Sequence, residues 1–336
     1  MVATTYPARD VQPLPSQRGP MSAALCAVLT GAADAASLPA DVPAAAPYGE
    51  DLQLALYLCY ELHYRSVAGV DGDLEWDPDL LRFRRLLERR FLAALRSDVA
   101  AGDDVDGALE PLLVEAVEGV GPSWFLASVG ERWQLREFIV HRSLYHLKEA
   151  DPQSWVIPRL QGQAKASLVT VQHDEYGAGR GDRMHAQLFA DTMRELGLDP
   201  AYGAYLDVVP AAALAPVNLM SLLGLHRSLR GSAVAQFASV EVTSSPGSAR
   251  LSAPFARLDG GRAGQRFYDE HVEADAVHEQ LIRSELLRYL LDREPDLAAD
   301  VVFGIQANLL VEDRFADHVL AAWSENRPSL LRPLPT

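Results

Sequence analysis

The sequence predicts an all-α protein, and two features of its residue pattern support that prediction. After residue 50, apolar residues recur every three to four positions through most of the chain, which is the period of an amphipathic helix. Strand signals are weak, because stretches of alternating apolar and polar residues are short and no Asn-Gly or Asp-Gly turn joins two of them. We therefore expect a helical bundle whose core helices face a shared buried interior.

The predicted helices follow this periodicity in order along the chain. They are Leu52–Tyr64, Leu80–Leu95, Leu109–Val117, Trp133–Leu147, Ala164–His173, Asp182–Leu196, Ala211–Leu223, Ala233–Thr243, Ala263–Asp292 and Leu297–Trp323. Short breaks that contain glycine and proline separate them, such as Gly119–Pro122 and Ser244–Gly247. No internal repeat is evident, so the simplest interpretation is one domain over residues 48–330.

Residues 1–47 differ in composition from the rest of the chain. They are rich in alanine, and prolines at positions 7, 13, 15, 20, 39, 43 and 47 would interrupt any long element. We expect an Ala/Pro-rich arm that is partly disordered and holds at most one short helix, around Met21–Thr30.

Composition and charge exclude several classes of function. The 336 residues carry a formal net charge of −16 and no cluster of Lys and Arg, which argues against nucleic-acid partners and anionic membranes. Only two cysteines occur, and they are not paired as CxxC, so a disulfide framework and an iron–sulfur site are excluded. The N-terminus lacks an apolar signal core, and no apolar run reaches about 18 residues. We expect a cytoplasmic protein without a membrane partner.

The first candidate site lies on one face of a predicted helix. His271, Asp275 and His278 are spaced by four and three residues, which places them within roughly 60° of arc on an α-helix. Two imidazoles and a carboxylate form a ligand set that suits iron with open coordination positions. The alternative is a solvated polar face, because further acidic residues surround these three.

Four further candidate ligands lie upstream of that helix. Glu149 and Glu175 close two predicted helices, and Glu241 is an isolated acid among apolar and small residues, where burial requires a partner or a metal. His185 follows Glu175 after the glycine-containing turn GAGRG. Ten residues of unbroken helix would misalign Glu175 and His185, and the glycines allow a local unwinding that corrects this. Each residue alone also fits an ordinary surface or core position.

Together, these four carboxylates and three imidazoles are a sufficient ligand set for two irons in a helical bundle, with one carboxylate bridging the irons. They also lie in long motifs. These are KEADPQSWVIPRLQGQAKASLVTVQHDEYGAGRGDRMHAQLFADTMRELGLD (148–199), VEVTSS (240–245), FYDEHVEADAVHE (267–279) and, upstream, YLCYELHYRS (57–66). The chain resembles the iron-containing redox enzyme family, a group of haem-oxygenase-like diiron oxidases and oxygenases, over most of residues 50–325.

This resemblance implies a haem-oxygenase-like seven-helix bundle that binds two irons and no haem. The family's metal ligands fall on Glu149, Glu175, His185, Glu241, His271, Asp275 and His278. By analogy with the family, Glu175 bridges the irons. One iron would then take Glu149, His185 and His278, and the other Glu241, His271 and Asp275. The helix near residues 265–285 is expected to become ordered on loading of the second iron.

Four further residues are candidates for a substrate pocket. Glu61 and Tyr64 share one face of the predicted helix 52–64, where structural packing is an equally good explanation. Arg180 and Arg183 flank the turn before His185 and would suit a substrate carboxylate, although a solvated turn explains them as well.

The resemblance is greatest to the N-oxygenating members of the family. It implies an enzyme that reduces O2 to a peroxide on two ferrous ions and oxygenates an amine or guanidine nitrogen of a small amino-acid-derived substrate in specialised metabolism. Its partners would be that substrate, O2 and an external electron donor, and a homodimer is consistent with such a bundle. One alternative is a diiron oxidase that desaturates or cleaves a C–C bond of a fatty or amino acid. Another is a metal-free binding protein on the same fold.

Overall fold

The all-α prediction is confirmed by the structure, a computed structural model that describes residues 11–42, 44–114 and 118–334. Within these ranges the chain forms helices joined by turns and short 3-10 segments, with no strand. The α-helices are α1 (Pro20–Leu29), α2 (Glu50–Glu61), α3 (Pro78–Asp98), α4 (Val105–Leu109), α5 (Pro122–Ser128), α6 (Arg132–His146), α7 (Asp151–Ser154), α8 (Gly162–Glu175), α9 (His185–Glu195), α10 (Ala211–Leu225), α11 (Arg230–Arg257), α12 (Arg262–Gln280), α13 (Arg288–Arg293) and α14 (Ala298–Ser324).

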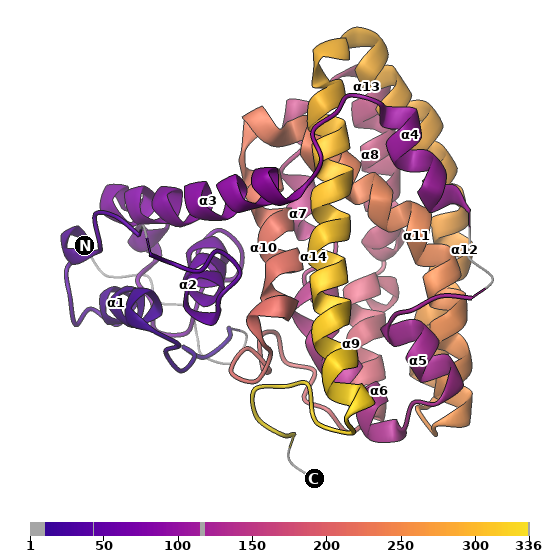
Figure 1. Ribbon diagram of the computed structural model, residues 1–336, viewed down its shortest axis with the longest axis horizontal. Coiled ribbons are helices and arrows are strands. Elements are labelled where there is room, and N and C mark those ends of the chain that lie inside the picture. Colours follow the sequence, from indigo (N-terminus) through magenta and orange to yellow (C-terminus); the bar gives the residue numbers. More distant parts are fainter. Residues whose placement is uncertain (1–10, 43, 115–117, 335–336) are drawn as a thin grey trace.

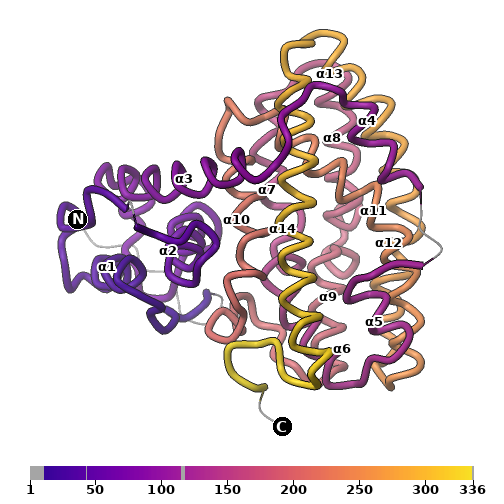
Figure 2. The backbone as a smooth tube through the Cα atoms, in the orientation of Figure 1, coloured from indigo at the N-terminus to yellow at the C-terminus, as the bar shows by residue number. Residues whose placement is uncertain are grey.

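The helices form a long bundle with a smaller lobe at its side. In Figure 1, α1, α2 and α3 lie beside the bundle, and α14 runs along the bundle's length. The tube in Figure 2 shows how the chain leaves α3, crosses to one end of the bundle and continues into α4. The most extensive helix contacts are those of α11 with α12 and with α14, so α11 is the central helix of the bundle.

The short helix expected around Met21–Thr30 is present as α1, and it packs against α2. The Asp51 carboxylate at the start of α2 accepts hydrogen bonds from the backbone N–H groups of Met21 (2.8 Å) and Ser22 (2.7 Å). These bonds satisfy donors that the first turn of a helix otherwise leaves open. Helix α1 is therefore tied to α2 across the predicted boundary at residue 47.

The predicted break at Ser244–Gly247 is wrong. Helix α11 continues through Pro246 and ends at Arg257, 28 residues after it begins. A proline inside a helix removes one backbone hydrogen bond. Packing of α11 along α12 and α14 compensates for that loss, and Ser245 Oγ donates to the Val272 carbonyl of α12 at 3.2 Å.

Three other predicted helices differ from the structure. The prediction Leu109–Val117 is wrong over its described part, because α4 ends at Leu109 and a 3-10 segment, Glu110–Leu113, follows it; residues 115–117 lie outside the described residues. Helix α6 ends at His146, so Glu149 lies in the turn before α7 and not in the last turn of a helix. The predicted helix 263–292 is divided by a π-helical segment, Leu281–Leu287, that directly follows α12. The sequence pattern did not distinguish this segment from ordinary α-helix because its apolar spacing is nearly the same. Such π segments often accompany functional sites.

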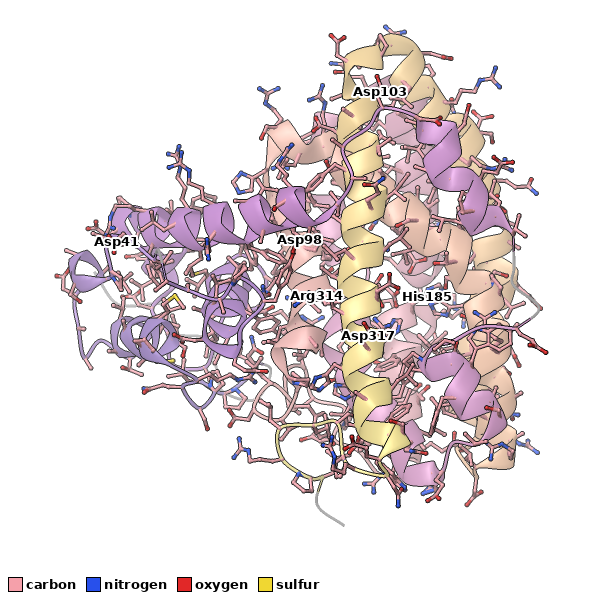
Figure 3. All side chains as sticks on the ribbon, viewed as in Figure 1. Asp41, Asp98, Asp103, His185, Arg314 and Asp317 are labelled. Carbon is pink, nitrogen blue, oxygen red and sulfur yellow. The ribbon has the colours of Figure 1, made fainter. Side chains whose placement is uncertain are left out.

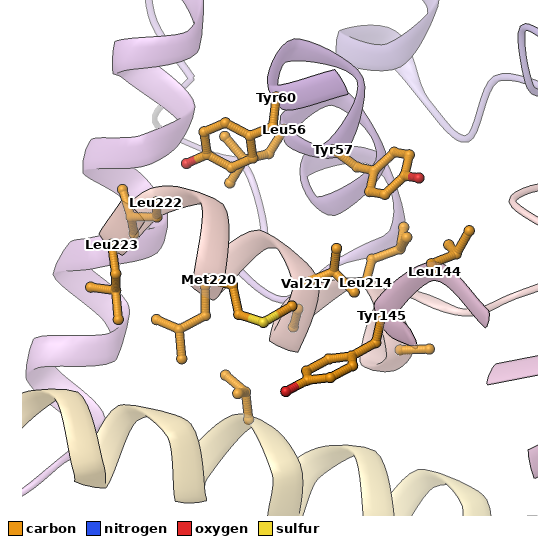
Figure 4. Packing of buried hydrophobic residues seen from close by; sticks show 14 of the residues in the cluster. Leu56, Tyr57, Tyr60, Leu144, Tyr145, Leu214, Val217, Met220, Leu222 and Leu223 are labelled. Carbon is orange, nitrogen blue, oxygen red and sulfur yellow. The ribbon is translucent and has the colours of Figure 1, made fainter. Parts of the chain in front are cut away.

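One apolar core runs through the lobe and the bundle. Tyr57 and Tyr60 of α2 are fully buried and lie over Met220 of α10, and Tyr145 of α6 lies on the other side of α10 (Figure 4). Among the helices described, none is both long and apolar enough to cross a membrane.

Candidate metal centre

The structure brings all seven predicted metal ligands into the interior of the bundle. Glu149 comes from the turn after α6, Glu175 from the last position of α8 and His185 from the first position of α9. Glu241 lies in the middle of α11, and the remaining three are the predicted face of α12. His185 lies within the bundle, as Figure 3 shows. Apart from Glu149, whose side chain is 14% exposed, each of the seven is at most 5% exposed.

The seven side chains form two adjacent groups. Glu149, His185 and His271 make up the first, and the second contains Glu175, Glu241, Asp275 and His278. In each group, one ligand atom per residue lies within 4.8 Å of every other. That spacing allows a single metal ion to be reached by all members of a group.

Glu175 lies between the two groups. Its Oε2 atom is 2.8 Å from Nδ1 of His185 in the first group, and its Oε1 atom is 3.6 Å from Nδ1 of His278 in the second. The two oxygens of one carboxylate therefore face two different groups, which is the arrangement that a bridging ligand requires.

The division of the other ligands differs from the one expected by analogy. His271 lies with Glu149 and His185, and His278 lies with Glu241 and Asp275, so the two imidazoles are exchanged relative to that expectation. The reason is geometric. His271 and His278 are seven residues apart, which is about two turns of α12. Each imidazole therefore contacts the group of side chains that lies beside its own turn of the helix.

Four buried polar atoms within this site make no hydrogen bond of good geometry among the described residues, although Glu175 Oε2 and His185 Nδ1 lie 2.8 Å apart. They are Glu175 Oε2, His185 Nδ1, His271 Nε2 and Asp275 Oδ2. Buried polar atoms are nearly always paired, so four unpaired ones that converge on two points need an explanation. Coordination of two metal ions would satisfy all four, and the carboxylate-and-imidazole donor set fits iron.

Neighbouring groups determine which imidazole nitrogen is available for a metal. His271 Nδ1 donates to the Phe267 carbonyl one turn earlier, at 2.7 Å, which leaves the Nε2 lone pair facing Glu149. His278 is held the other way round: Nε2 lies 3.2 Å from Asp174 Oδ2, and Nδ1 faces Glu241. Carboxylate and carbonyl partners of this kind orient histidine ligands in metal sites.

Asp174 and His146 are site residues that the sequence interpretation missed. His146 Nδ1 lies 3.0 Å from Oε2 of Glu149, three residues later, and its ring packs between Phe189 and Phe267. The three-residue spacing was a usable signal for His146. Asp174 gave none, because its partner His278 is brought to it only by the packing of distant parts of the chain.

The charges of the site shift the pKa values of its members. Burial alone would lower the pKa of both α12 imidazoles, but the surrounding carboxylates outweigh it and raise the pKa of His271 to about 10 and that of His278 to about 11. Burial, reinforced by Asp275, raises the pKa of Glu241 well above its usual range. Burial opposes ionisation of Glu149, yet His146 and His271 together hold the pKa of that carboxyl low.

The glycine turn between α8 and α9 aligns Glu175 with His185. Gly177 and Gly179 adopt φ values of +67° and +80°, and two 3-10 segments replace the continuous helix. A Cβ atom on Gly177 would lie 2.6 Å from the backbone of both Arg183 and Met184. Only glycine allows this close approach, so the predicted local unwinding is present and has a specific sequence requirement.

Two predicted pocket residues lie in a buried cluster next to the metal ligands. The Glu61 carboxylate forms an ion pair with Lys148, and both side chains are 0% exposed. Glu61 also accepts a hydrogen bond from the Tyr202 hydroxyl at 2.9 Å, and the Lys148 ammonium lies 4.4 Å from the centre of the Tyr64 ring. Lys148 was not singled out from the sequence, although it directly precedes the ligand Glu149.

The other two predicted pocket residues lie on the surface. Arg180 pairs with Asp182 at 3.1 Å, and Arg183 lies 3.8 Å from Glu270. Both guanidinium groups are about half exposed or more, and neither lines the two cavities that border the metal ligands in the described part of the chain. The structure thus does not bring them together with the rest of the site.

Two cavities reach the metal ligands from different sides. An inner cavity is lined by Glu149, Glu175 and Glu241 together with Lys148 and apolar residues, and it has room for about 10 Å³, at most one water molecule. An open cleft of about 360 Å³ between α11 and α12 reaches Glu241 and Asp275. Of the seven predicted ligands, Glu241 and Asp275 thus border the cleft, and Glu149, Glu175 and Glu241 border the small inner cavity.

Comparisons with known proteins place the chain in a family and support its fold. The model of a family described as iron-containing redox enzymes matches residues 136–313. A nitrosourea synthase from Streptomyces achromogenes subsp. streptozoticus is 24% identical over 208 residues, which is 61% of this chain and 44% of that protein, so the chain spans less than half of its relative. A CADD-like protein of unknown function from Nostoc punctiforme PCC 73102 superimposes on 66% of this chain and 98% of its own, with a TM-score of 0.51 and 16% identity. The last comparison supports the fold alone.

Proposed function

This chain belongs to the iron-containing redox enzyme family, and we propose that it is a diiron oxygenase that uses O2 to oxidise a nitrogen atom of a small amine or guanidine. The observation that supports the diiron centre most directly is Glu175. Its two carboxylate oxygens face two separate groups of buried ligands, each with unpaired atoms. A single metal ion would leave one of these groups without a metal to satisfy its unpaired atoms.

In this proposal Glu149, His185 and His271 hold one iron, and Glu241, Asp275 and His278 hold the other, with Glu175 between them. Such an iron pair, when bound, supplies the electrons that activate O2. The chain's own part is to fix the ligands through Asp174 and His146, and to keep the inner cavity small and enclosed, which excludes water. Insertion of one oxygen atom with reduction of the other to water needs two electrons, so we also propose an external donor.

The choice of a nitrogen atom as the oxidised centre rests on two observations. The curated relative is named a nitrosourea synthase, and a nitrosourea carries an oxidised nitrogen. The inner cavity has room for at most one water molecule, and three carboxylates and an ammonium group lie among its apolar lining residues, so no long apolar tunnel for a fatty-acid chain leads through it to the ligands. Oxidation at carbon of a small amino acid would use the same ligands and is distinguished by experiment.

The experiment begins with anaerobic titration of the chain with ferrous iron, followed by exposure to O2 with a panel of amines and guanidines. We expect about two irons per chain and O2 uptake that depends on a nitrogenous substrate, with an N-oxygenated product found by mass spectrometry. Binding of clearly fewer than two irons would contradict the diiron centre. If the chain binds iron but the product is oxidised at carbon, N-oxygenation is wrong and the carbon-oxidising alternative holds. If the chain consumes no O2, a binding protein is favoured.

A further inference from the structure

Two small cavities meet at the side chains of Gln153 and Met220. The inner cavity borders Glu149, Glu175 and Glu241, and Gln153 and Met220 form part of its wall. The same two side chains also line a neighbouring, less enclosed cavity between α7, α10 and α11, which likewise has room for about 10 Å³. Gln153 and Met220 therefore separate a space beside the metal ligands from a second space farther out.

Gln153 has an unusual environment for a buried amide. The residue is 8% exposed, its Oε1 atom has no hydrogen-bond partner within the described part of the chain, and its Nε2 atom makes only a 3.8 Å contact to Met220 Sδ. Turning the amide round would not help, because a thioether sulfur accepts weakly but cannot donate. A buried acceptor without a donor is destabilising, and this one lies between two cavities from which a donor can reach it.

We propose that Gln153 determines substrate specificity by accepting a hydrogen bond from an N–H group of the substrate, which places the nitrogen-bearing end beside Glu149, Glu175 and Glu241. This inference rests on the proposed function and narrows its substrate class to amines and guanidines that carry an N–H donor. It also assigns Gln153 and Met220 as the gate through which that end enters the inner cavity.

The charges around the inner cavity favour such a donor over an anion. Three carboxylates line it, and among the described residues the only basic side chain in its wall is Lys148, whose ammonium is already paired with Glu61 in a fully buried contact. In the metal-free chain, an anionic group would face the three carboxylates with little uncompensated positive charge. A cationic or neutral N–H donor meets three carboxylate acceptors.

The gate must move to admit a substrate, and its side chains are suited to this. Methionine is unbranched and flexible, and the single N–H···S contact that joins it to Gln153 is weak. The backbone next to these two side chains, in contrast, is tightly packed. A Cβ on Gly224 would lie 2.5 Å from the Pro152 carbonyl, so α10 and α7 are in close contact there. Of the three residues that line both cavities, Gln153 and Met220 can change rotamer, whereas the ring of Pro152 cannot.

The test uses methylguanidinium as the probe, with acetate as an anion of similar size. Binding to the full chain is measured by NMR saturation transfer and titration without oxygen, with and without ferrous iron. We compare the wild type with Gln153→Leu, which removes the acceptor at similar volume, and Gln153→Glu, which strengthens it. Gln172→Leu is the matched control, because Gln172 is another buried glutamine but lines neither cavity.

We expect methylguanidinium to bind about tenfold more weakly to Gln153→Leu, more tightly to Gln153→Glu and equally to Gln172→Leu, with no binding of acetate. Gln153→Leu should be at least as stable as the wild type, since it removes an unpaired buried acceptor. With iron bound, the probe's methyl protons should relax faster than in the metal-free chain.

The proposal is overturned if the wild type does not bind the probe, if Gln153→Leu binds it equally well, or if Gln172→Leu loses as much affinity. Failure to bind iron or to consume O2 would instead count against the proposed function. The affinities of the variants for methylguanidinium can be compared without bound iron and without O2 uptake. Failure of this inference can therefore be distinguished from failure of the proposed function.

Discussion

Asp174 and His146 determine how ligands of this site are presented, although neither belongs to the seven. Asp174 directly precedes the ligand Glu175 but contacts a different ligand, His278, from another helix. His146 contacts the ligand Glu149 close to it in the chain. Each contact orients one side chain and favours one protonation state, which is how outer groups raise the affinity of a metal site.

Removing the Asp174 carboxylate should weaken one iron site selectively. In Asp174→Ala we expect affinity for the iron bound by His278 to fall about 10–100-fold, because the imidazole loses the acceptor that fixes its Nε2–H. Anaerobic titration with ferrous iron would then resolve one tight and one weakened site. The exposed Asp182, which pairs only with Arg180 among the contacts described, provides the control variant Asp182→Ala. Equal weakening in both variants would contradict this role.

The raised pKa values of His271 and His278 predict a specific pH dependence. Both values, about 10 and about 11, lie above the unfolded value of about 6.5. These imidazoles therefore stabilise the metal-free fold fully below pH ~6.5, and that contribution is lost as the pH rises through the folded values. Iron binding requires neutral imidazoles, so iron affinity should rise over the same range.

Thermal unfolding from pH 6 to pH 10, with and without ferrous iron, measures both effects. The Tm of the metal-free chain should decrease with pH, and the increase in Tm on adding iron should grow. In the double variant His271→Gln/His278→Gln both trends should be much smaller. A metal-free Tm that rises with pH would show that the two imidazoles are not held protonated by their carboxylate neighbours.

At the scale of elements, the positions of the predicted ligands depend on where the helices begin and end and on which helices pack together. Helices α11 and α12 pack closely along their length and supply four of the seven ligands, which fixes the spacing of the second group. The turn between α8 and α9 joins the two groups, because it holds Glu175 and His185 at 2.8 Å. A change in that turn should therefore affect metal binding from a distance.

Gly177→Ala tests the turn directly. Because Gly177 has a φ of +67° and a Cβ there would lie 2.6 Å from two backbone atoms, we expect a loss of stability of about 1–3 kcal/mol. Iron binding by His185 should weaken at the same time, since the start of α9 must shift. Gly181→Ala is the matched control in the same turn, because nothing lies within 4 Å of its Cβ position. Denaturant unfolding and iron titration of both variants provide the measurement.

At the scale of the molecule, the lobe and the bundle are joined through charge as well as through apolar packing. Glu61 belongs to α2 of the lobe and Lys148 to the turn that carries Glu149, and their ion pair is fully buried. Burial lowers the pKa of Lys148, while Glu61 opposes that shift. The lobe thus contacts the segment that carries a metal ligand and does not merely lie beside it (Figure 1).

Breaking this pair should be far more harmful than replacing it. Glu61→Leu leaves a buried ammonium without its partner, and we expect a loss of about 3–5 kcal/mol in the free energy of unfolding. The double variant Glu61→Leu/Lys148→Met removes both charges and should recover most of that loss. Chemical denaturation of the two single variants and the double variant gives the coupling energy. Additive effects would mean that the pair does not act as a unit.

The sequence by itself determined the helical class and the supply of ligands. Helical periodicity is local, so most helices could be placed without knowledge of their neighbours. The three residues on one face of α12 followed from helix geometry alone. The glycines between Glu175 and His185 likewise indicated a turn, because an unbroken helix would point the two side chains in different directions. The resemblance to a family completed the ligand list.

Only the tertiary structure decided how these residues combine. The position of α12 along its axis relative to the neighbouring helices determines which group each of its imidazoles joins. The continuation of α11 through Pro246 depends on its packing against two partner helices. The roles of Asp174 and Gln153 are invisible in sequence, since neither has a partner at a regular spacing. Periodicity specifies the faces of single helices, whereas contacts between distant segments depend on the packing of all of them together.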